Sequence, residues 1–173
     1  MKKTYLYLLA LTLFVAACGG NNQTGNQDTT AKVEEVDPAS IPGIDTVKQT
    51  DIVSLKANDD MHFDKELFKV KSGKKITLRL KNIGSQTGKP MSHNVVILQK
   101  GTDIATFADE ARKFKDQDYI PAAMASSIVA HTKQVIAGKT NETQFTITKP
   151  GVYDFICSYP GHWGTMQGKI VAE

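Results

Sequence analysis

The chain from Asp51 onward is a series of short runs in which apolar or β-branched residues alternate with polar ones. Alternation with a period of two is typical of strands that bury one face against a core. Turn residues separate the runs, as at Ser72-Gly73 and Lys149-Pro150-Gly151. We expect strands over residues 52–56, 67–70, 76–80, 93–98, 144–147, 152–156 and 168–171, with a weaker candidate at 128–135. Seven or eight short strands over about 120 residues predict an all-β fold, a sandwich or barrel.

One segment departs from this pattern. Between Asp103 and Phe114 the apolar side chains recur at helical spacing, at Ile104, Phe107, Ala108, Ala111 and Phe114. Such a stripe predicts a short amphipathic helix inserted between strands and packed against the sandwich. Residues 115–127 are expected to be irregular or to add one further turn. We find no internal repeat and no second domain.

The first 17 residues have the pattern of an export signal. Lys2 and Lys3 precede an apolar stretch over 5–15 and the small residues Ala16-Ala17. This stretch is too short to span a membrane. Residues 15–18, Val-Ala-Ala-Cys, resemble the lipobox of bacterial lipoproteins, which implies cleavage before Cys18 and acylation of that cysteine. Several acyl chains would anchor the protein stably; an ordinary signal peptide beside a chance cysteine is the alternative.

The sequence after Cys18 is polar and of low complexity as far as about residue 49. Such a composition buries too little apolar surface to order itself. We therefore divide the chain into a signal peptide (1–17), a lipidated cysteine with a flexible tether (18–49), and one folded domain (50–173). Two apolar patches in the tether, at 33–36 and 41–44, are the places where it would pack on the domain.

Charge and cysteine content narrow the function. The 173 residues carry a formal net charge of +3, and without Lys2 and Lys3 the rest has 19 basic and 18 acidic residues. This balance does not suit a nucleic-acid partner, which calls for clustered basic side chains.

The chain has two cysteines, and lipid on Cys18 would leave Cys157 without a disulfide partner. A free thiolate in an oxidising compartment is prone to oxidation, and a bound metal ion would protect it.

Potential metal ligands surround Cys157. His162 and Met166 follow it after the expected strand 152–156, and His93 lies on a distant strand. A thiolate is a soft donor that binds copper in both oxidation states, neutral imidazoles suit either state, and a distant thioether tunes the potential. Two histidines, one cysteine and an axial methionine are the ligands of a blue-copper electron-transfer centre. The other histidines, His62 and His131, are not expected to bind metal.

The spacing Cys-x4-His-x3-Met after an upstream His-Asn resembles the cupredoxin family, and specifically the azurins. Residues 91–94, 118–119, 128–133 and 157–162 are similar too, and the similarity extends over about 51–173. The resemblance implies a Greek-key sandwich of about eight strands with a helical insertion. It also implies one type 1 copper ion, bound by His93, Cys157, His162 and Met166. Azurins carry glycine at the position of Ser92, and the backbone carbonyl of that glycine lies near copper. Serine keeps a backbone carbonyl, so the resemblance implies a weak further contact of Ser92 with copper.

The resemblance also implies the surroundings of the copper ion. The backbone N–H groups of Asn94 and Tyr159 would point at the Cys157 sulfur, and such outer hydrogen bonds orient ligands and set the potential. Apolar residues around the edge of His162 would give redox partners a small docking surface. The residues expected there are Pro90, Met91, Pro160, Gly161 and Trp163.

We expect a monomeric, membrane-anchored copper protein that transfers single electrons between redox protein partners. Its expected location is the bacterial cell envelope, on the periplasmic or extracytoplasmic face. A copper chaperone or storage protein with the same fold is the alternative, and zinc could occupy the same ligands. An enzyme is disfavoured, because multicopper oxidases and copper nitrite reductases need further histidine clusters, which two separated spare histidines do not supply.

Overall fold

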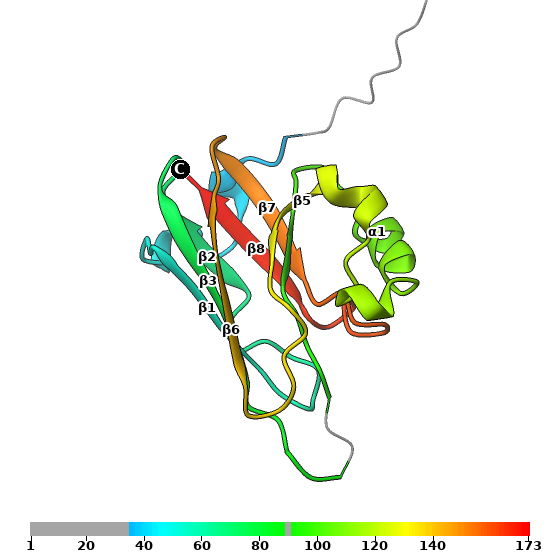
Figure 1. The fold of residues 1–173 in the computed structure, drawn as a ribbon. Helices are drawn as coiled ribbons and strands as arrows, with labels where there is room; N and C mark the ends of the chain where they lie inside the picture. Colours follow the sequence, from blue (N-terminus) through cyan, green and yellow to red (C-terminus); the bar gives the residue numbers. More distant parts are fainter. Residues whose placement is uncertain (1–34, 89–90) are drawn as a thin grey trace, which may run out of the picture. The chain divides into compact units, whose positions relative to one another are not determined.

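The computed structural model describes residues 35–88 and 91–173. The strands in these ranges are β1 (Ile52–Ala57), β2 (Leu67–Val70), β3 (Lys75–Asn82), β4 (Val96–Leu98), β5 (Ile128–His131), β6 (Thr140–Thr146), β7 (Gly151–Ile156) and β8 (Gln167–Ala172). They form a three-stranded sheet in the order β1-β3-β6 and a five-stranded sheet in the order β2-β8-β7-β4-β5 (Figure 1). The all-β sandwich of about eight strands that the sequence predicts is confirmed.

The chain crosses repeatedly between the two sheets. Only β4–β5 and β7–β8 are neighbours both in the chain and in a sheet, and both pairs are antiparallel. The β1–β3 and β2–β8 pairs are parallel. Parallel neighbours need crossover connections, so segments far apart in the sequence meet at each end of the sandwich.

The core lies between the two sheets. Alternate residues of β3, including Ile76, Leu78 and Leu80, are fully buried and belong to one apolar cluster with Phe155 of β7 and Ile170 of β8. Each such side chain contributes roughly 1.5–3 kcal/mol by leaving water. The alternation that predicted the strands is therefore the alternation that builds the core.

Three of the predicted strands differ from the observed ones by three or more residues at one end. The candidate over 128–135 is shorter, because β5 ends at His131. The strand expected over 93–98 is shorter, since β4 begins only at Val96 and His93 pairs through an isolated bridge with Val135. The strand expected over 144–147 is longer, because β6 pairs with β3 from Thr140 onward. Most side chains of β6 before Phe145 are polar and exposed or half-buried, so its first part lacks the apolar alternation of a half-buried strand.

The inserted helix is α1 (Ile104–Ala111), slightly shorter than predicted. The Asp103 side chain caps its N-terminus by accepting a hydrogen bond from the Thr106 N–H at 2.7 Å. Phe107, Ala108 and Ala111 are buried, as the helical stripe indicated. The following segment, expected to be irregular or to add one further turn, contains two 3-10 helices, Lys115–Gln117 and Ala122–Ser127.

Residues 35–50 form an N-terminal strap on the five-stranded sheet. The strap contains two 3-10 helices, Pro38–Ser40 and Ile44–Thr46. The Ile44 side chain is only 3% exposed and packs with Val152 of β7 and Val171 of β8. This part of the segment assigned to a flexible tether is therefore packed on the domain.

The remaining N-terminal predictions concern residues outside the described ranges. These are the signal peptide over 1–17, the lipidation site Cys18 and the first part of the tether. Within residues 35–88 and 91–173, no helix has both the length and the apolarity needed to cross a membrane.

Candidate metal centre

The pairing of β4 with β7 brings the predicted ligands together. Val96 pairs with Ile156 in this antiparallel ladder, so the residues before β4 and those after β7 lie at the same end of the sandwich. His93 precedes β4, and Cys157 directly follows β7. The loop from Cys157 to β8 carries His162 and Met166.

Three of the predicted ligands form a compact group. One potential donor atom from each of His93, Cys157 and His162 lies within 4.8 Å of the others. The Cys157 Sγ is 3.7 Å from the His162 Nδ1. His93 and Cys157 are fully buried, and His162 is 4% exposed. Within the described part of the chain, this is the one group of three or more His, Cys, Asp or Glu side chains arranged to hold a metal ion.

The donor atoms fit one copper ion. Both ring nitrogens of His93 are buried without a hydrogen-bond partner. An unsatisfied buried polar group costs about 1–3 kcal/mol, and a metal ion bound to one nitrogen would remove part of that cost. Two imidazoles and one thiolate are the trigonal donor set of blue-copper sites.

Met166 is held against the ligand loop by its backbone. The Cys157 N–H donates to the Met166 carbonyl at 2.9 Å, and the Met166 N–H donates to the His162 carbonyl at 2.8 Å. Its side chain is fully buried in the same apolar cluster as Cys157. Axial ligation of copper by Met166 remains a prediction, and so does the weak contact of copper with the backbone carbonyl of the half-buried Ser92.

Burial controls the protonation of the ligands. It raises the pKa of the Cys157 thiol to about 12, although hydrogen bonds from the backbone N–H groups of Asn94 and Tyr159 act in the opposite direction. Burial, assisted by the charge of His162, lowers the pKa of His93 to about 4. Burial also lowers the pKa of His162. At neutral pH both imidazoles are therefore neutral and can donate a lone pair, whereas the thiol must lose its proton to bind metal.

The side chain of Asn94 links the two segments that carry ligands. Its Oδ1 accepts from the Ser158 N–H at 2.8 Å, and its Nδ2 donates to the Ser158 Oγ and to the Asp118 carbonyl, both at 2.8 Å. The Ser158 hydroxyl donates to the Tyr119 carbonyl at 2.9 Å. Sequence reasoning missed Ser158, which has no distinguishing pattern of its own.

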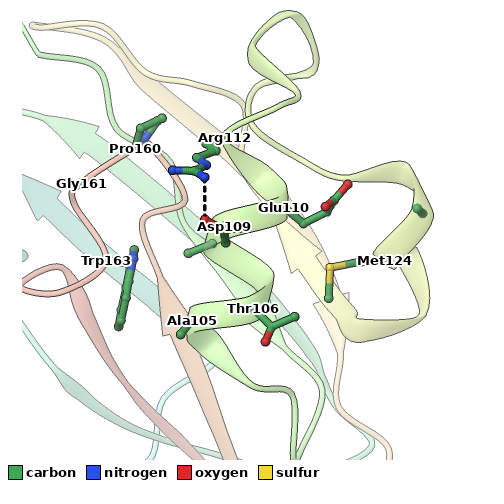
Figure 2. Close-up of a pocket in the computed structure, with 11 residues that line it drawn as sticks. Ala105, Thr106, Asp109, Glu110, Arg112, Met124, Pro160, Gly161 and Trp163 are labelled. Atoms are coloured by element: carbon green, nitrogen blue, oxygen red, sulfur yellow. Dashed lines mark ion pairs between the residues drawn. The ribbon is translucent and has the colours of Figure 1, made fainter.

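Three of the five residues expected to dock partners line an open groove of about 780 Å³. Figure 2 shows Pro160, Gly161 and Trp163 facing α1 across this groove. Pro160 and Gly161 are exposed, and Trp163 and Met91 are half-buried. Pro90 lies outside the described ranges. The helix was expected only to pack on the core, but its outer face also lines the groove, through Ala105, Thr106, Asp109 and Glu110, together with Arg112 directly after its end.

The two remaining histidines are exposed and do not belong to the metal-binding group. His62 lies in the turn after β1, and His131 ends β5. The structure therefore separates the four histidines of the chain into two buried potential ligands and two surface residues.

Comparisons of the sequence with known proteins agree with this geometry. The family model for copper binding proteins of the plastocyanin/azurin family matches residues 50–173. The azurin of Alcaligenes faecalis is 34% identical over 122 residues, which cover 68% of this chain and 94% of that azurin. The azurin of Achromobacter denitrificans is 32% identical over 121 residues, covering 68% of this chain and 80% of the relative.

Solved structures give the same result. The dithionite-reduced auracyanin of Roseiflexus castenholzii is 29% identical with a TM-score of 0.66, covering 73% of this chain and 99% of that one. Auracyanin A of Chloroflexus aurantiacus, described as a "blue" copper protein, is 27% identical with a TM-score of 0.60, covering 73% of this chain and 100% of that one. The chain therefore belongs to the plastocyanin/azurin family of copper-binding proteins.

Proposed function

We propose that this protein is a lipid-anchored blue copper protein that carries single electrons between redox protein partners. The observation that carries the proposal is the buried group of His93, Cys157 and His162, whose donor atoms lie within 4.8 Å of one another. Family membership and this ligand group make the protein a carrier with one type 1 copper ion, not an enzyme. We place it at the bacterial cell envelope, on the periplasmic or extracytoplasmic face, as a monomer.

The proposed ligands are His93, Cys157 and His162, with Met166 as the weak axial ligand and the Ser92 carbonyl as a further weak contact. Copper in such a site supplies a one-electron couple between Cu(II) and Cu(I). The thiolate and the neutral imidazoles suit both oxidation states. Because the ligand side chains are almost completely buried, water is kept from the donor atoms.

The surrounding residues hold the ligands and tune the sulfur. The hydrogen bonds between Cys157, His162 and Met166 limit movement of the loop during electron transfer. The backbone N–H groups of Asn94 and Tyr159 withdraw electron density from the Cys157 sulfur. A less electron-rich thiolate stabilises Cu(II) less, which favours the reduced state.

We propose that partners dock where the ligand loop reaches the surface. Pro160 and Gly161 are exposed beside His162, and the half-buried Trp163 lies on the same loop. With Met91 they form the proposed apolar docking surface next to a ligand; Pro90, the further residue that the sequence adds to it, lies outside the described residues. Weak redox encounters bury less than about 1,200 Å² in total, which permits rapid release.

The lipid anchor is proposed from the sequence Val-Ala-Ala-Cys at residues 15–18. Replacement of Cys18 with serine should move the protein from the membrane fraction to the soluble fraction of cells. The Cys157→Ser variant is the matched control, because it removes the other cysteine and should remain in the membrane fraction. Wild-type protein found in the soluble fraction would contradict the anchor.

The copper assignment is tested by optical and paramagnetic-resonance spectra of the copper-loaded protein beside the Cys157→Ser variant. The wild type should show an intense thiolate-to-copper absorption and reversible one-electron reduction, and the variant should lose the absorption. His131→Gln, at an exposed histidine outside the group, should leave the spectrum unchanged. Identical spectra for wild type and Cys157→Ser would disprove the site, and a colourless protein that binds Cu(I) would favour storage.

A further inference from the structure

His93 lies on a stretch of chain with little regular structure. It pairs with Val135 through an isolated bridge, in which the His93 N–H donates to the Val135 carbonyl at 3.2 Å and the Val135 N–H donates to the His93 carbonyl at 2.7 Å. Neither ring nitrogen has a hydrogen-bond partner. The Asn58 backbone is close enough to raise the pKa of the ring, against the larger lowering effect of burial.

The weak hold on the ring makes the position of the His93 backbone important for the direction of the ring. Histidines that bind metals almost always donate their second ring N–H to a carboxylate, a carbonyl or water, which fixes the ring. The His93 ring makes no hydrogen bond of good geometry, and the Asn58 backbone is its one weak candidate partner. The position of the His93 backbone therefore contributes to how the ring meets Cys157 and His162.

The buried side chain of Asn82, at the end of β3, contacts the backbone on both sides of this bridge. Its Nδ2 donates to the Met91 carbonyl at 2.8 Å and to the Val135 carbonyl at 2.9 Å. Met91 lies two residues before His93, and Val135 is the bridge partner of His93. One carboxamide therefore ties the ligand segment to its neighbour, at a point where the direct bond from the His93 N–H is long.

The carboxamide of Asn82 is itself held in one orientation. Its Oδ1 accepts from the Gly84 N–H at 2.9 Å, its backbone N–H donates to the Lys139 carbonyl at 3.0 Å, and its carbonyl accepts from the Gly138 N–H at 2.9 Å. A Cβ on Gly84 would lie 3.0 Å from the Asn82 Oδ1 and would collide with the Asp59 carboxylate. A fully paired buried group of this kind is rigid.

We propose that Asn82 is a positioning residue for the His93 ligand. By holding the Met91 and Val135 carbonyls, it sets the direction from which the ring of His93 reaches the donor atoms of Cys157 and His162. The proposal rests on metal ligation by His93 in the proposed function. Asn82 itself makes no contact with the metal in this role.

The test uses Asn82→Asp, which keeps the side-chain shape and an acceptor for the Gly84 N–H. The variant loses both donors and places a carboxylate oxygen against two carbonyl oxygens. Asn141→Asp is the control, because Asn141 lies on β6 and only accepts a hydrogen bond, from the Lys133 N–H at 3.0 Å. The measurements are Cu(II) affinity by competition, the optical and paramagnetic-resonance spectra, and the thermal midpoint of the metal-free protein.

We expect Asn82→Asp to lower Cu(II) affinity by about 10–100-fold, the usual effect of removing an outer-shell partner, and to change the spectra. Asn141→Asp should match the wild type. A lower thermal midpoint with wild-type affinity and spectra would make Asn82 merely structural and overturn the proposal.

A second measurement decides the matter if Asn82→Asp does not fold. In the metal-free wild-type protein, the side-chain amide protons of Asn82 should exchange slowly with solvent, and the His93 ring should give one set of resonances. Rapid exchange of these amide protons in a folded protein would overturn the proposal. This result does not depend on copper, so it is distinct from failure of the proposed function, which would appear as a wild-type protein without the thiolate-to-copper absorption.

Discussion

At the scale of single residues, Cys157 determines both the metal preference and the pH response of the site. Its sulfur is the soft donor, and complete burial raises the pKa of the thiol to about 12. The imidazoles of His93 and His162 have lowered pKa values and are neutral at pH 7. Metal binding at neutral pH should therefore release one proton, which comes from the Cys157 thiol.

This exchange predicts that each divalent metal ion bound at pH 7 releases about one proton, with the apparent affinity rising about tenfold per pH unit. Zn(II) is a suitable redox-silent probe, titrated into weakly buffered metal-free protein with a pH indicator. Cys157→Ser should release fewer protons than the wild type. Release of two or three protons would show that the histidines are charged before binding.

Met166 is predicted to tune the potential of the copper ion. Met166→Gln should retain copper but lower the reduction potential, because an amide oxygen is a harder donor than a thioether and stabilises Cu(II). We expect a decrease of at least about 59 mV in voltammetry, which is a tenfold change for one electron. Met124→Gln, at a half-buried methionine that lines the groove, should leave the potential unchanged. An unchanged potential in Met166→Gln would argue against axial ligation.

At the scale of the elements, β7 and β8 carry both the core and the ligand loop. Gly168 on β8 pairs with Phe155 on β7. A Cβ at position 168 would collide with the Glu66 carbonyl and the Phe155 ring. The close packing of this strand pair depends on the absence of a side chain there.

Gly168→Ala should therefore lower the free energy of unfolding by about 1–3 kcal/mol, the usual cost of overpacking. Urea denaturation of the metal-free protein measures the change. Gly164→Ala is the matched control, because a Cβ on Gly164 would have no neighbour within 4 Å. Equal stability of the two variants would contradict the packing argument.

At the scale of the whole domain, the N-terminal end of the strap joins the sandwich far from the metal centre. Glu35 forms an ion pair with Lys100 at 2.5 Å, and the Lys100 Nζ also donates to the Pro150 carbonyl at 3.0 Å. Pro150 directly precedes β7, and Cys157 directly follows it. A strand of this length spans roughly 20 Å, so Glu35 meets the sandwich at the end of β7 opposite Cys157.

The strap should contribute to stability without affecting the metal site. Ile44→Ala is expected to lower the free energy of unfolding by about 2 kcal/mol or more, as buried isoleucine truncations do, and to leave the copper spectrum and potential unchanged. Val36→Ala, at a side chain that is 48% exposed, should have little effect on either. A changed spectrum in Ile44→Ala would show that the strap acts on the ligands.

The sequence by itself determined the features that depend on residue type and local spacing. Apolar alternation predicted most of the strands, since a period of two is what one buried sheet face requires. Apolar residues at helical spacing predicted α1, since a helix that packs on a core buries one face. The donor chemistry of His93, Cys157, His162 and Met166 limited the metal to a soft or borderline ion, before any distance was known.

Only the tertiary structure decided the features that depend on partners distant in the chain. The first half of β6 pairs with β3, although its polar side chains gave no apolar pattern. The sequence marked the apolar patch 41–44 as a place for packing, but only the fold supplies the surface of β7 and β8 that buries Ile44. Asn82 lies next to Met91 and Val135 only because the crossovers of the sandwich bring three segments together. The residue types that supply the donor atoms can be read from the local sequence. The positions of these atoms depend on pairing between strands distant in the chain, which no local pattern shows.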